Sequence, residues 1–340
     1  MATFDVVTIG GAVRDITFYT SQGKVFATPD DLTAQKLLAF EYGAKIYAQR
    51  AHYELGGGAL NAAVSLSRLR LKTAALVRLG NDQDAADVRL RFKREQVCPD
   101  FIQVDPKAHT GFSLIVALDK REHEHVAFLY RGANENLTAP LGSLKQSTIG
   151  WLYLTALSGP RWPGALKQFF QIAKSKQRNT KIVWNPGSSQ LQAGRRNLDF
   201  CLRHTDVLIL NKDEAIELVL SGITVGRRNP SYLNRPLYLL NILKEWGPKV
   251  VIITDGTKGA WAYDGARIHH QHAVPVKRIA DTTGVGDAFG SGFLAGFVNT
   301  KGDSKQALRW GVQNAGSVCT QVGAQNGLLT LRELKGKIKL

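Results

Sequence analysis

The sequence predicts an α/β protein with a doubly wound, mostly parallel sheet and a small β-rich lid. Short apolar runs alternate with amphipathic stretches along most of the 340 residues. The apolar runs are nearly continuous, which is typical of strands that helices cover on both faces. Two segments, 13–56 and 106–131, break this alternation and lack clear helix signals.

The main sheet and its helices are expected from the alternating part of the chain. Because helical segments lie between the strands, we expect neighbouring strands to run parallel. The candidate strands are 4–10, 73–80, 150–157, 181–187, 205–211 and 250–256. The candidate helices are 59–70, 84–97, 162–176, 212–220 and 231–246.

The two irregular segments are expected to form the lid. The runs 113–119 and 125–131 are typical of antiparallel strands, joined by a charged turn at 120–124. Inserted β segments of this kind often cover the carboxyl ends of parallel strands, where ligands bind in doubly wound sheets. The chain has no internal repeat and no linker rich in Pro, Gly and Ser, so we expect residues 1–340 to form one domain with a lid.

Composition excludes several classes of protein. The net charge is +16, but basic clusters such as 89–96 and 174–178 carry no interleaved aromatic residues, so we expect no nucleic-acid partner. No run approaches the roughly 20 apolar residues of a membrane span, so we expect no membrane partner. Cys98, Cys201 and Cys319 are too far apart for a disulfide framework or a CxxC metal site, which fits a reducing cytoplasm.

The stretch DTTGVGDAFGSG (281–292) places four glycines around one aspartate, just before a helical run. Dinucleotide binding fits it poorly, because the glycines come late in the chain and Asp287 would repel a pyrophosphate. The P-loop pattern GxxxxGK[ST] does not occur in the sequence.

Phosphoryl transfer explains the same stretch better. The backbone amides of Gly284, Val285 and Gly286 would point at an anion, and the dipole of the following helix adds about half a positive charge. Asp287 could then accept a proton from a substrate hydroxyl as its oxygen attacks a γ-phosphate. Glycine permits the close backbone approach that such a loop needs.

Two motifs resemble those of the PfkB (ribokinase-like) carbohydrate kinase family. DTTGVGDAF resembles the family's C-terminal signature, usually written DTTGAGDxF, with Val285 in place of Ala. ELGGGALNAAVSLSRL (54–69), followed by VRLGND (77–82), resembles its N-terminal signature. The resemblance extends from TIGGAVRD near the start to VGAQNGLL near the end of the chain.

The resemblance implies a kinase that uses ATP and Mg²⁺ to phosphorylate a hydroxyl of a small sugar or sugar derivative, such as ribose or fructose. A nucleoside kinase or a 2-keto-3-deoxygluconate kinase of the same family is the alternative acceptor class. Outside this class, a catalytically silent regulator that binds nucleotide or nucleic acid, and an NAD(P) oxidoreductase, are the competing hypotheses.

Acceptor binding is assigned by the resemblance to residues near the N-terminal signature. Asp15, Gly57, Gly58 and Asn61 would hold the sugar hydroxyls, because a carboxylate and an amide together suit a polyol. Without the family, Asp15 could be a turn residue and Asn61 a contact within a helix N-terminus. Arg131 ends a lid strand and could grip an acidic acceptor or form an ion pair within the lid.

Nucleotide binding is assigned to later motifs. LNKDEA (210–215) resembles the family's N-x-x-E motif, in which Asn211 and Glu214 lie near the triphosphate and Glu214 holds Mg²⁺ through water. The same two residues could simply cap the helix 212–220. The other nucleotide contacts that the resemblance implies are Thr254, Gly256, Gly259 and Asn314.

Two further expectations concern a cation and a partner. Some such kinases bind a monovalent cation, and here Asp281 with the main chain of Thr283 and Gly323 would coordinate an ion such as K⁺. The exposed edge of the lid could pair with a second copy of the chain to give a homodimer.

Overall fold

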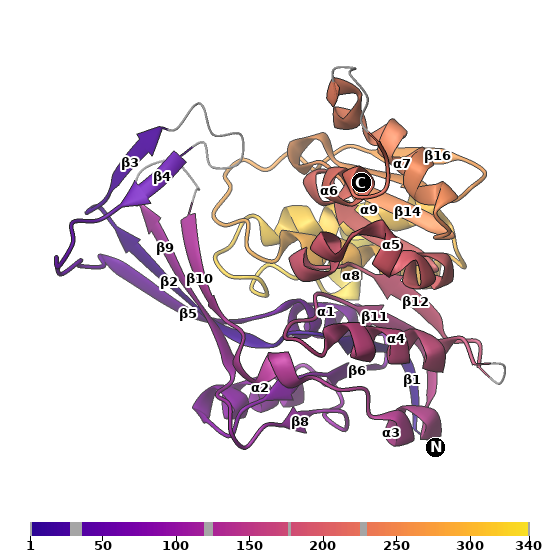
Figure 1. Ribbon diagram of the computed structural model, residues 1–340, viewed down its shortest axis with the longest axis horizontal. Helices are drawn as coiled ribbons and strands as arrows, with labels where there is room; N and C mark the ends of the chain where they lie inside the picture. Colours follow the sequence, from indigo (N-terminus) through magenta and orange to yellow (C-terminus); the bar gives the residue numbers. More distant parts are fainter. Residues whose placement is uncertain (1, 28–35, 119–124, 176–177, 225–229, 339–340) are drawn as a thin grey trace.

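The computed structural model describes residues 2–27, 36–118, 125–175, 178–224 and 230–338 (Figure 1). The turn expected at 120–124 lies outside these residues. The main sheet has eight strands in the spatial order β16-β15-β14-β13-β12-β11-β1-β6. The expected α/β class and mostly parallel sheet are therefore confirmed.

Six neighbouring strands of the main sheet run parallel, and the last two do not. The parallel strands are β1 (Thr3–Ile9), β6 (Thr73–Leu76), β11 (Thr148–Leu154), β12 (Lys181–Trp184), β13 (Val207–Asn211) and β14 (Val250–Thr254). The antiparallel strands are β15 (Ala260–Tyr263) and β16 (Ile268–Gln271). The loop 255–259 is too short for a parallel crossover, so β15 turns back beside β14.

The run 73–80 was predicted as one strand but forms two. β6 ends at Leu76, and β7 (Arg78–Leu79) leaves the main sheet to pair with β8 (Gln103–Val104). The chain thereby turns from the core toward the lid.

Helices cover both faces of the main sheet. One face carries α4 (Trp162–Ala173), α5 (Ser188–His204), α6 (Lys212–Leu220) and α7 (Pro236–Glu245), and near its edge lies α3 (Leu141–Gln146). The other face carries α1 (Gly58–Arg68), α2 (Gln83–Arg94), α8 (Val285–Asn299), α9 (Ser304–Val318) and α10 (Leu331–Ile338). Short 3₁₀ helices are η1 (Gly132–Asn136), η2 (Pro230–Asn234) and η3 (Gly256–Lys258). Among the described residues no helix is both long and apolar enough to cross a membrane.

Two helices differ from their predictions for local reasons. α7 begins at Pro236 instead of residue 231, because proline suits the first helical position, where no amide hydrogen is needed. α5 was not predicted, because Gly194 has non-helical backbone angles that divide its sequence into two short pieces.

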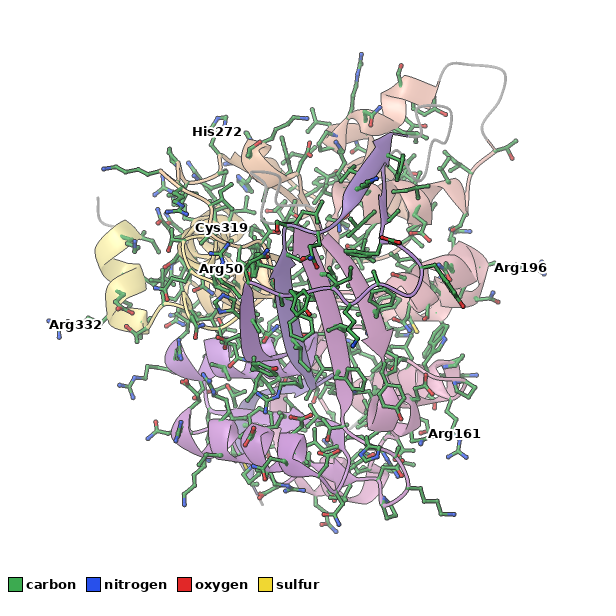
Figure 2. The ribbon with its side chains drawn as sticks, turned by 90° about the vertical axis from the view of Figure 1, so that its left-hand side faces the viewer. Arg50, Arg161, Arg196, His272, Cys319 and Arg332 are labelled. Atoms are coloured by element: carbon green, nitrogen blue, oxygen red, sulfur yellow. The ribbon has the colours of Figure 1, made fainter. Side chains whose placement is uncertain are left out.

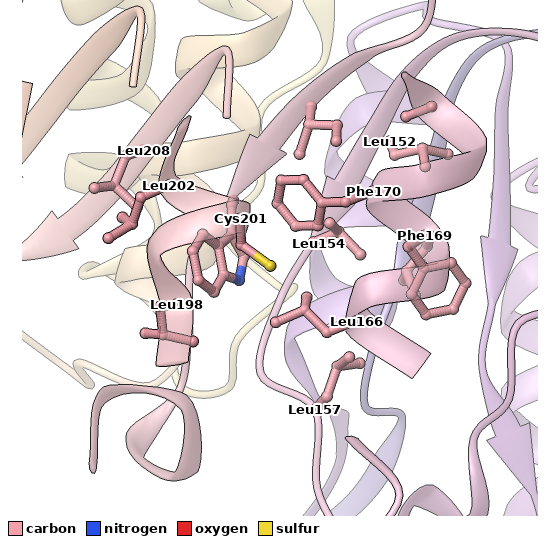
Figure 3. Close-up of a cluster of buried hydrophobic side chains, with 14 of the residues drawn as sticks. Leu152, Leu154, Leu157, Leu166, Phe169, Phe170, Leu198, Cys201, Leu202 and Leu208 are labelled. Carbon is pink, nitrogen blue, oxygen red and sulfur yellow. The ribbon is translucent and has the colours of Figure 1, made fainter. Parts of the chain in front are cut away.

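The core on the first face is made by aromatic and aliphatic side chains from strand and helix together. Phe169 and Phe170 of α4 lie over Leu152 and Leu154 of β11, next to Cys201 of α5 (Figure 3). Both phenylalanines are fully buried, so their large apolar side chains help to anchor α4 to the sheet.

A second sheet forms the lid beside the main sheet (Figure 1). Its order is β10-β9-β2-β5, built from β2 (Val13–Thr20), β5 (Arg50–Gly56), β9 (Gly111–Leu118) and β10 (His125–Tyr130). β3 (Lys24–Ala27) and β4 (Lys36–Ala39) form a separate hairpin pair at its tip. β9 and β10 are antiparallel, with Phe112 opposite Tyr130, as the sequence predicted.

Helices α8 and α9 approach each other closely through glycines. A β-carbon added at Gly296 would lie 2.8 Å from Trp310 Cγ and 2.9 Å from Ala307 Cα. Since Trp310 and Ala307 are buried, neither can move aside easily. This contact holds α8, whose first turn enters the candidate site, against the body of the protein.

We expect Gly296→Ala to lower the free energy of unfolding by about 1–3 kcal/mol, because the added methyl overpacks this interface. Urea denaturation followed by circular dichroism measures the change. Gly164→Ala in α4 is the matched control, since no atom lies within 4 Å of the added carbon there. Equal stability of the two variants would contradict the close-packing explanation.

Candidate active site

The candidate site lies where the lid joins the carboxyl ends of the main strands. The chain leaves β1 through Gly10 and Gly11 and enters the lid at β2. A cavity of about 180 Å³ opens beside this junction. Its lining includes Gly11, Asp15, Gly57, Gly58, Ser113, Arg131, Asn134, Ser158, Ser188 and Ser189.

The glycines of the N-terminal signature allow two backbone segments to touch. Gly57 has a φ of 97°, and a β-carbon there would lie 2.5 Å from the carbonyl oxygen of Gly11. Gly58 packs on Thr155, where the added carbon would lie 3.0 Å from its side chain. These contacts place the start of α1 at the floor of the cavity.

Asp15 projects from β2 into the cavity. Gly56 makes room for it, because a β-carbon at 56 would lie 1.8 Å from Asp15 Oδ2. Burial raises the pKa of the Asp15 carboxyl, the negative charge of Asp281 acts in the same direction, and a hydrogen bond from Ser113 opposes them. Asp15 is therefore a poorly solvated acceptor, as expected of a group that holds ligand hydroxyls.

Asp287 occupies the first turn of α8, next to the N-terminal signature. Asn61 Nδ2 of α1 donates to Asp287 Oδ2 at 2.9 Å. Burial raises the pKa of the Asp287 carboxyl, while the Asn61 hydrogen bond lowers it and the charge of Asp15 raises it. The structure thus brings Asp15, Asn61 and Asp287 together. The side chain of Asn61, however, points toward Asp287 and does not line the cavity.

The glycine-rich loop forms the entrance to α8. Gly284 has a left-handed φ of 73°, and a β-carbon there would lie 2.3 Å from Ala324 Cβ. Val285 begins the helix, and the exposed Gly286 has no neighbouring atom within 4 Å of an added β-carbon. Space is therefore open beside Gly286 at the amide end of α8, where the helix dipole would attract an anion; the Val285 amide donates to the Thr282 carbonyl at 3.4 Å.

The residues of the N-x-x-E motif lie at the end of β13. Asn211 Oδ1 accepts from Glu214 N at 2.8 Å, and Glu214 Oε2 accepts from Asn211 N at 2.9 Å. This reciprocal pair is the helix cap that the sequence left open as an interpretation. Burial raises the pKa of the Glu214 carboxyl; the Asn211 amide lowers it, and nearby acids including Asp287 raise it.

Glu214 suits a magnesium ion held through water. Within the described part of the chain its second oxygen, Oε1, makes no hydrogen bond, and its charge is poorly solvated. A hard cation would relieve this accumulation of negative charge, so the donor set fits Mg²⁺.

The turn that follows β14 lies beside this pair. Thr254 is opposite Asn211 in the parallel register. Gly256 has a φ of 48°, and Gly259 has a φ of 93° that places a β-carbon 2.1 Å from the Gln271 carbonyl oxygen. Glycine is therefore required at 259 by packing, whether or not a ligand binds there.

The three residues proposed for a monovalent cation are close in space. Asp281 accepts from the amide and hydroxyl of Thr283, at 2.9 and 2.8 Å, and from the amide of Gly323 at 2.8 Å. Among the described residues no group of three or more His, Cys, Asp or Glu side chains could hold a metal ion. Any cation here would depend on main-chain carbonyl oxygens.

Residues 28–331 match the pattern of the pfkB family of carbohydrate kinases. The chain belongs to this family. Its members here include a fructokinase of Vibrio alginolyticus, 26% identical over 82% of this chain and 90% of the relative. A ribokinase of Haemophilus influenzae is 27% identical over 86% of this chain and 89% of the relative.

Solved structures show the same fold. A ribokinase of Arabidopsis thaliana complexed with ribose and ATP has a TM-score of 0.77 at 18% identity, and covers 100% of both chains. A nucleoside kinase of Burkholderia thailandensis in complex with inosine has a TM-score of 0.76 at 16% identity, covering 98% of this chain and 97% of that one. The expected ribokinase-like fold is confirmed, and the pfkB family makes the protein a phosphotransferase with an alcohol group as acceptor.

One nucleotide contact carried over from the pfkB family does not match the structure. Asn314 is 0% exposed, and its Nδ2 donates to Ser65 Oγ at 3.0 Å and to the Ala288 carbonyl at 2.8 Å. Its Oδ1 accepts from Leu329 N at 3.0 Å. The side chain ties α9 to α1 and α8, so it has no group left to face the nucleotide.

Sequence reasoning missed several polar residues around the site. Asn134 bonds both the amide and the carbonyl of Ala12, at 3.1 Å each, and so fixes the junction between β1 and β2. Tyr153 is fully buried beneath Gly290 of α8, and burial raises the pKa of its hydroxyl. Gln325 donates to Asn61. These residues lie outside the two signatures, and their apolar surroundings give no periodic signal.

We expect Asp15→Asn and Asp287→Asn each to raise the free energy of unfolding at pH 8 by about 1 kcal/mol, a common result at strained sites. Each carboxyl has a raised pKa in the folded protein, so the folded state binds more protons than the unfolded state. Stability therefore falls as pH rises through that window, and the gain should shrink at lower pH. Urea denaturation at pH 5 and pH 8 measures both changes.

Asp206→Asn is the control, and the expected change in its free energy of unfolding has the opposite sign. Asp206 is buried, which would raise its pKa, but hydrogen bonds from Lys174 and Lys249 outweigh burial and lower it. Asp206→Asn should therefore lower stability at pH 8. A loss of stability in the Asp15 and Asp287 variants at pH 8 would contradict the argument.

Proposed function

We propose that the protein transfers the γ-phosphoryl group of ATP to a hydroxyl of a small sugar, with Asp287 as the general base. The observation that carries this proposal is the position of Asp287, poorly solvated and held by Asn61 at the amide end of α8. Asp287 would take the proton of the acceptor hydroxyl while that oxygen bonds to the γ-phosphorus. The bond from phosphorus to the bridging oxygen breaks, and ADP leaves with its electron pair.

The acceptor would occupy the cavity beneath the lid. Asp15 would accept hydrogen bonds from sugar hydroxyls, while Gly57 and Gly58 let the ring approach the backbone. Asn61 would contact the acceptor only after the lid shifts, because its Nδ2 donates to Asp287 and its Oδ1 accepts from Gln325. The amides of Gly284, Val285 and Gly286 would stabilise the charge on the transferred group.

The nucleotide would lie across the ends of β13 and β14. Asn211, Thr254, Gly256 and Gly259 line this edge, and ATP is bound in the related Arabidopsis ribokinase. Magnesium held through water by Glu214 would neutralise phosphate charge. Asp281, with the main chain of Thr283 and Gly323, remains our proposed site for a monovalent cation such as K⁺.

We favour ribose, fructose or a similar sugar as acceptor, with nucleosides and 2-keto-3-deoxygluconate as alternatives. The fructokinase and ribokinase relatives support the first choice, and the inosine-bound nucleoside kinase supports the second. Arg131 supports the sugar acid 2-keto-3-deoxygluconate as an acceptor, because this arginine lines the cavity. Within the described residues it pairs with no carboxylate of the protein. An ADP-release screen over these acceptors decides among them.

The lid and the cysteines support two further proposals. Phe128 and Leu129 of the edge strand β10 are 59% and 53% exposed, one on each side of the strand, so this edge is open to pairing with the lid of a second copy. A homodimer through the lid is therefore the oligomer that we propose. Cys98, Cys201 and Cys319 are free thiols, in keeping with a reducing cytoplasm.

Asp287→Asn should lower turnover by about two to four orders of magnitude, the usual contribution of a positioned general base. Affinity for ATP should stay near the wild-type value, because the substitution keeps the shape and the hydrogen bond from Asn61. A coupled ADP assay measures turnover, and titration calorimetry measures ATP binding. Asp199→Asn, in a surface pair with Arg203, is the control. Turnover within tenfold of wild type would overturn the assigned role of Asp287.

Arg131→Ala should weaken the use of an acidic acceptor more than that of a neutral one. We expect the ratio of kcat/KM for the sugar acid to kcat/KM for ribose to fall about tenfold, since a charged hydrogen bond contributes roughly 1.5–3 kcal/mol. Parallel assays with 2-keto-3-deoxygluconate and ribose measure this ratio, which isolates the carboxylate contact from any general loss of activity. Arg332→Ala, on the distant helix α10, is the control (Figure 2). An unchanged ratio would mean that Arg131 does not read the charge of the acceptor.

A further inference from the structure

A chain of buried amide groups connects the lid to Asp287. Gln325 Nε2 donates to the carbonyl oxygen of Leu55 at 3.0 Å and to Asn61 Oδ1 at 2.9 Å. Asn61 Nδ2 in turn donates to Asp287 Oδ2 at 2.9 Å. Leu55 belongs to the lid strand β5, so the chain runs from the lid through two side-chain amides to the carboxylate.

The direction of these hydrogen bonds is fixed at both ends. The Leu55 carbonyl can only accept, and an ionised Asp287 can only accept. Asn61 must therefore turn its NH₂ group toward Asp287 and its oxygen toward Gln325. Only a donor at 325 satisfies that oxygen, and Gln325 supplies it.

The position of Gln325 is itself held firmly. Arg68 Nη1 donates to the Gln325 carbonyl oxygen at 3.1 Å, while Arg68 makes a two-point ion pair with Glu95. Gln325 is 3% exposed and Asn61 is 3% exposed, so water does not easily replace either bond.

The amide of Gln325 is used unevenly, because its nitrogen makes two hydrogen bonds and its oxygen makes none among the described residues. Gln325 Oε1 is buried and, among the described residues, has no hydrogen-bond partner. An apolar side chain of the same size would avoid that unsatisfied oxygen, but it would leave the Leu55 carbonyl and Asn61 Oδ1 without the donor that Gln325 supplies. The feature that requires glutamine is its pair of donors.

We infer that Gln325 is a positioning residue for phosphoryl transfer: its amide fixes the orientation of Asn61, and Asn61 thereby holds Asp287 aligned and ionised. This inference rests on the proposed role of Asp287 as general base. It adds a residue outside both signatures to the machinery, and it links the base of the lid to the reacting carboxylate.

The electrostatic surroundings of Asp287 make this role measurable. Asp15 of β2, Glu214 of α6 and the Tyr153 hydroxyl of β11 lie near it, and the two acids favour protonation. The hydrogen bond from Asn61 is the opposing interaction. If Asn61 can rotate, that bond weakens, and the pKa of Asp287 rises further.

The test compares Gln325→Leu and Gln325→Glu with the wild-type enzyme. Neither replacement can donate two hydrogen bonds at neutral pH, and both keep the approximate size of the side chain. We expect kcat near pH 7 to fall about tenfold, with KM for ATP unchanged, and the acid limb of the kcat/KM profile to move to higher pH. Thermal unfolding and circular dichroism establish that each variant is folded.

Thr180→Val is the control for a purely structural effect. Thr180 is buried, and its hydroxyl donates to the Ile149 carbonyl at 2.9 Å, at the opposite end of the sheet from the site. It should lower the melting temperature and leave the pH profile in place. A Gln325 variant that behaves like Thr180→Val overturns the positioning role.

The outcome also separates this inference from the proposed function. If Asp287→Asn keeps its turnover, the general-base proposal fails, whatever the Gln325 variants do. If Asp287→Asn is inactive while both folded Gln325 variants keep the wild-type kcat and pH profile, only the positioning role is wrong. A shifted acid limb in the uncharged Gln325→Leu variant, with KM for ATP unchanged, supports it, because a new carboxylate in Gln325→Glu would raise the pKa of Asp287 by its charge alone.

Discussion

The structure depends on one constraint: a carboxylate at the amide end of α8 must be poorly solvated and still be able to reach a ligand. Asp287 meets this requirement because Asn61 donates to it from α1 and because α8 can approach its neighbours closely. Gly290 permits the contact with Tyr153, and Gly296 permits the contact with α9. Packing far from the reacting atoms therefore determines where the base lies, and the helix is as much a support as a source of positive charge.

The site combines groups that would be unfavourable elsewhere. Burial raises the pKa of Asp15, Glu214 and Asp287, and each of these acids lies near another. In the folded protein without ligands this arrangement works against stability, because poorly solvated carboxylates repel one another. Hydroxyls of an acceptor and a cation beside the nucleotide would relieve that repulsion. The glycines provide space for a ligand, and the repulsion between the acids favours the binding of one.

Much of the architecture could be predicted from the sequence, because the buried strands and the two signatures carry strong local signals. The parallel strands of the main sheet, apart from the division of 73–80 into two, the antiparallel pair in the lid and the proximity of Asp15, Asn61 and Asp287 followed from them. The hairpin β15–β16 and the kinked helix α5 did not, since a short loop and the non-helical Gly194 determine them. Asn314 and Gln325 show the limit most clearly. In a sequence, a buried amide that binds a ligand looks the same as one that bonds only to groups of the protein, and only the folded structure distinguishes them.

Asp82, the last residue of the motif VRLGND (77–82), also connects the lid to the body of the protein. Asp82 caps α2 by accepting from Ala85 N at 2.9 Å, and it accepts from both the amide and the hydroxyl of Thr110 at 2.7 Å. Thr110 directly precedes the lid strand β9. One carboxylate thus connects the base of the lid to the body, whereas among the described residues no hydrogen bond connects the far ends of the lid strands to the body. Any rotation of the lid would therefore occur about the contact between Asp82 and Thr110. The displacement would be largest at the strand pair β3–β4 and very small beside the reacting groups.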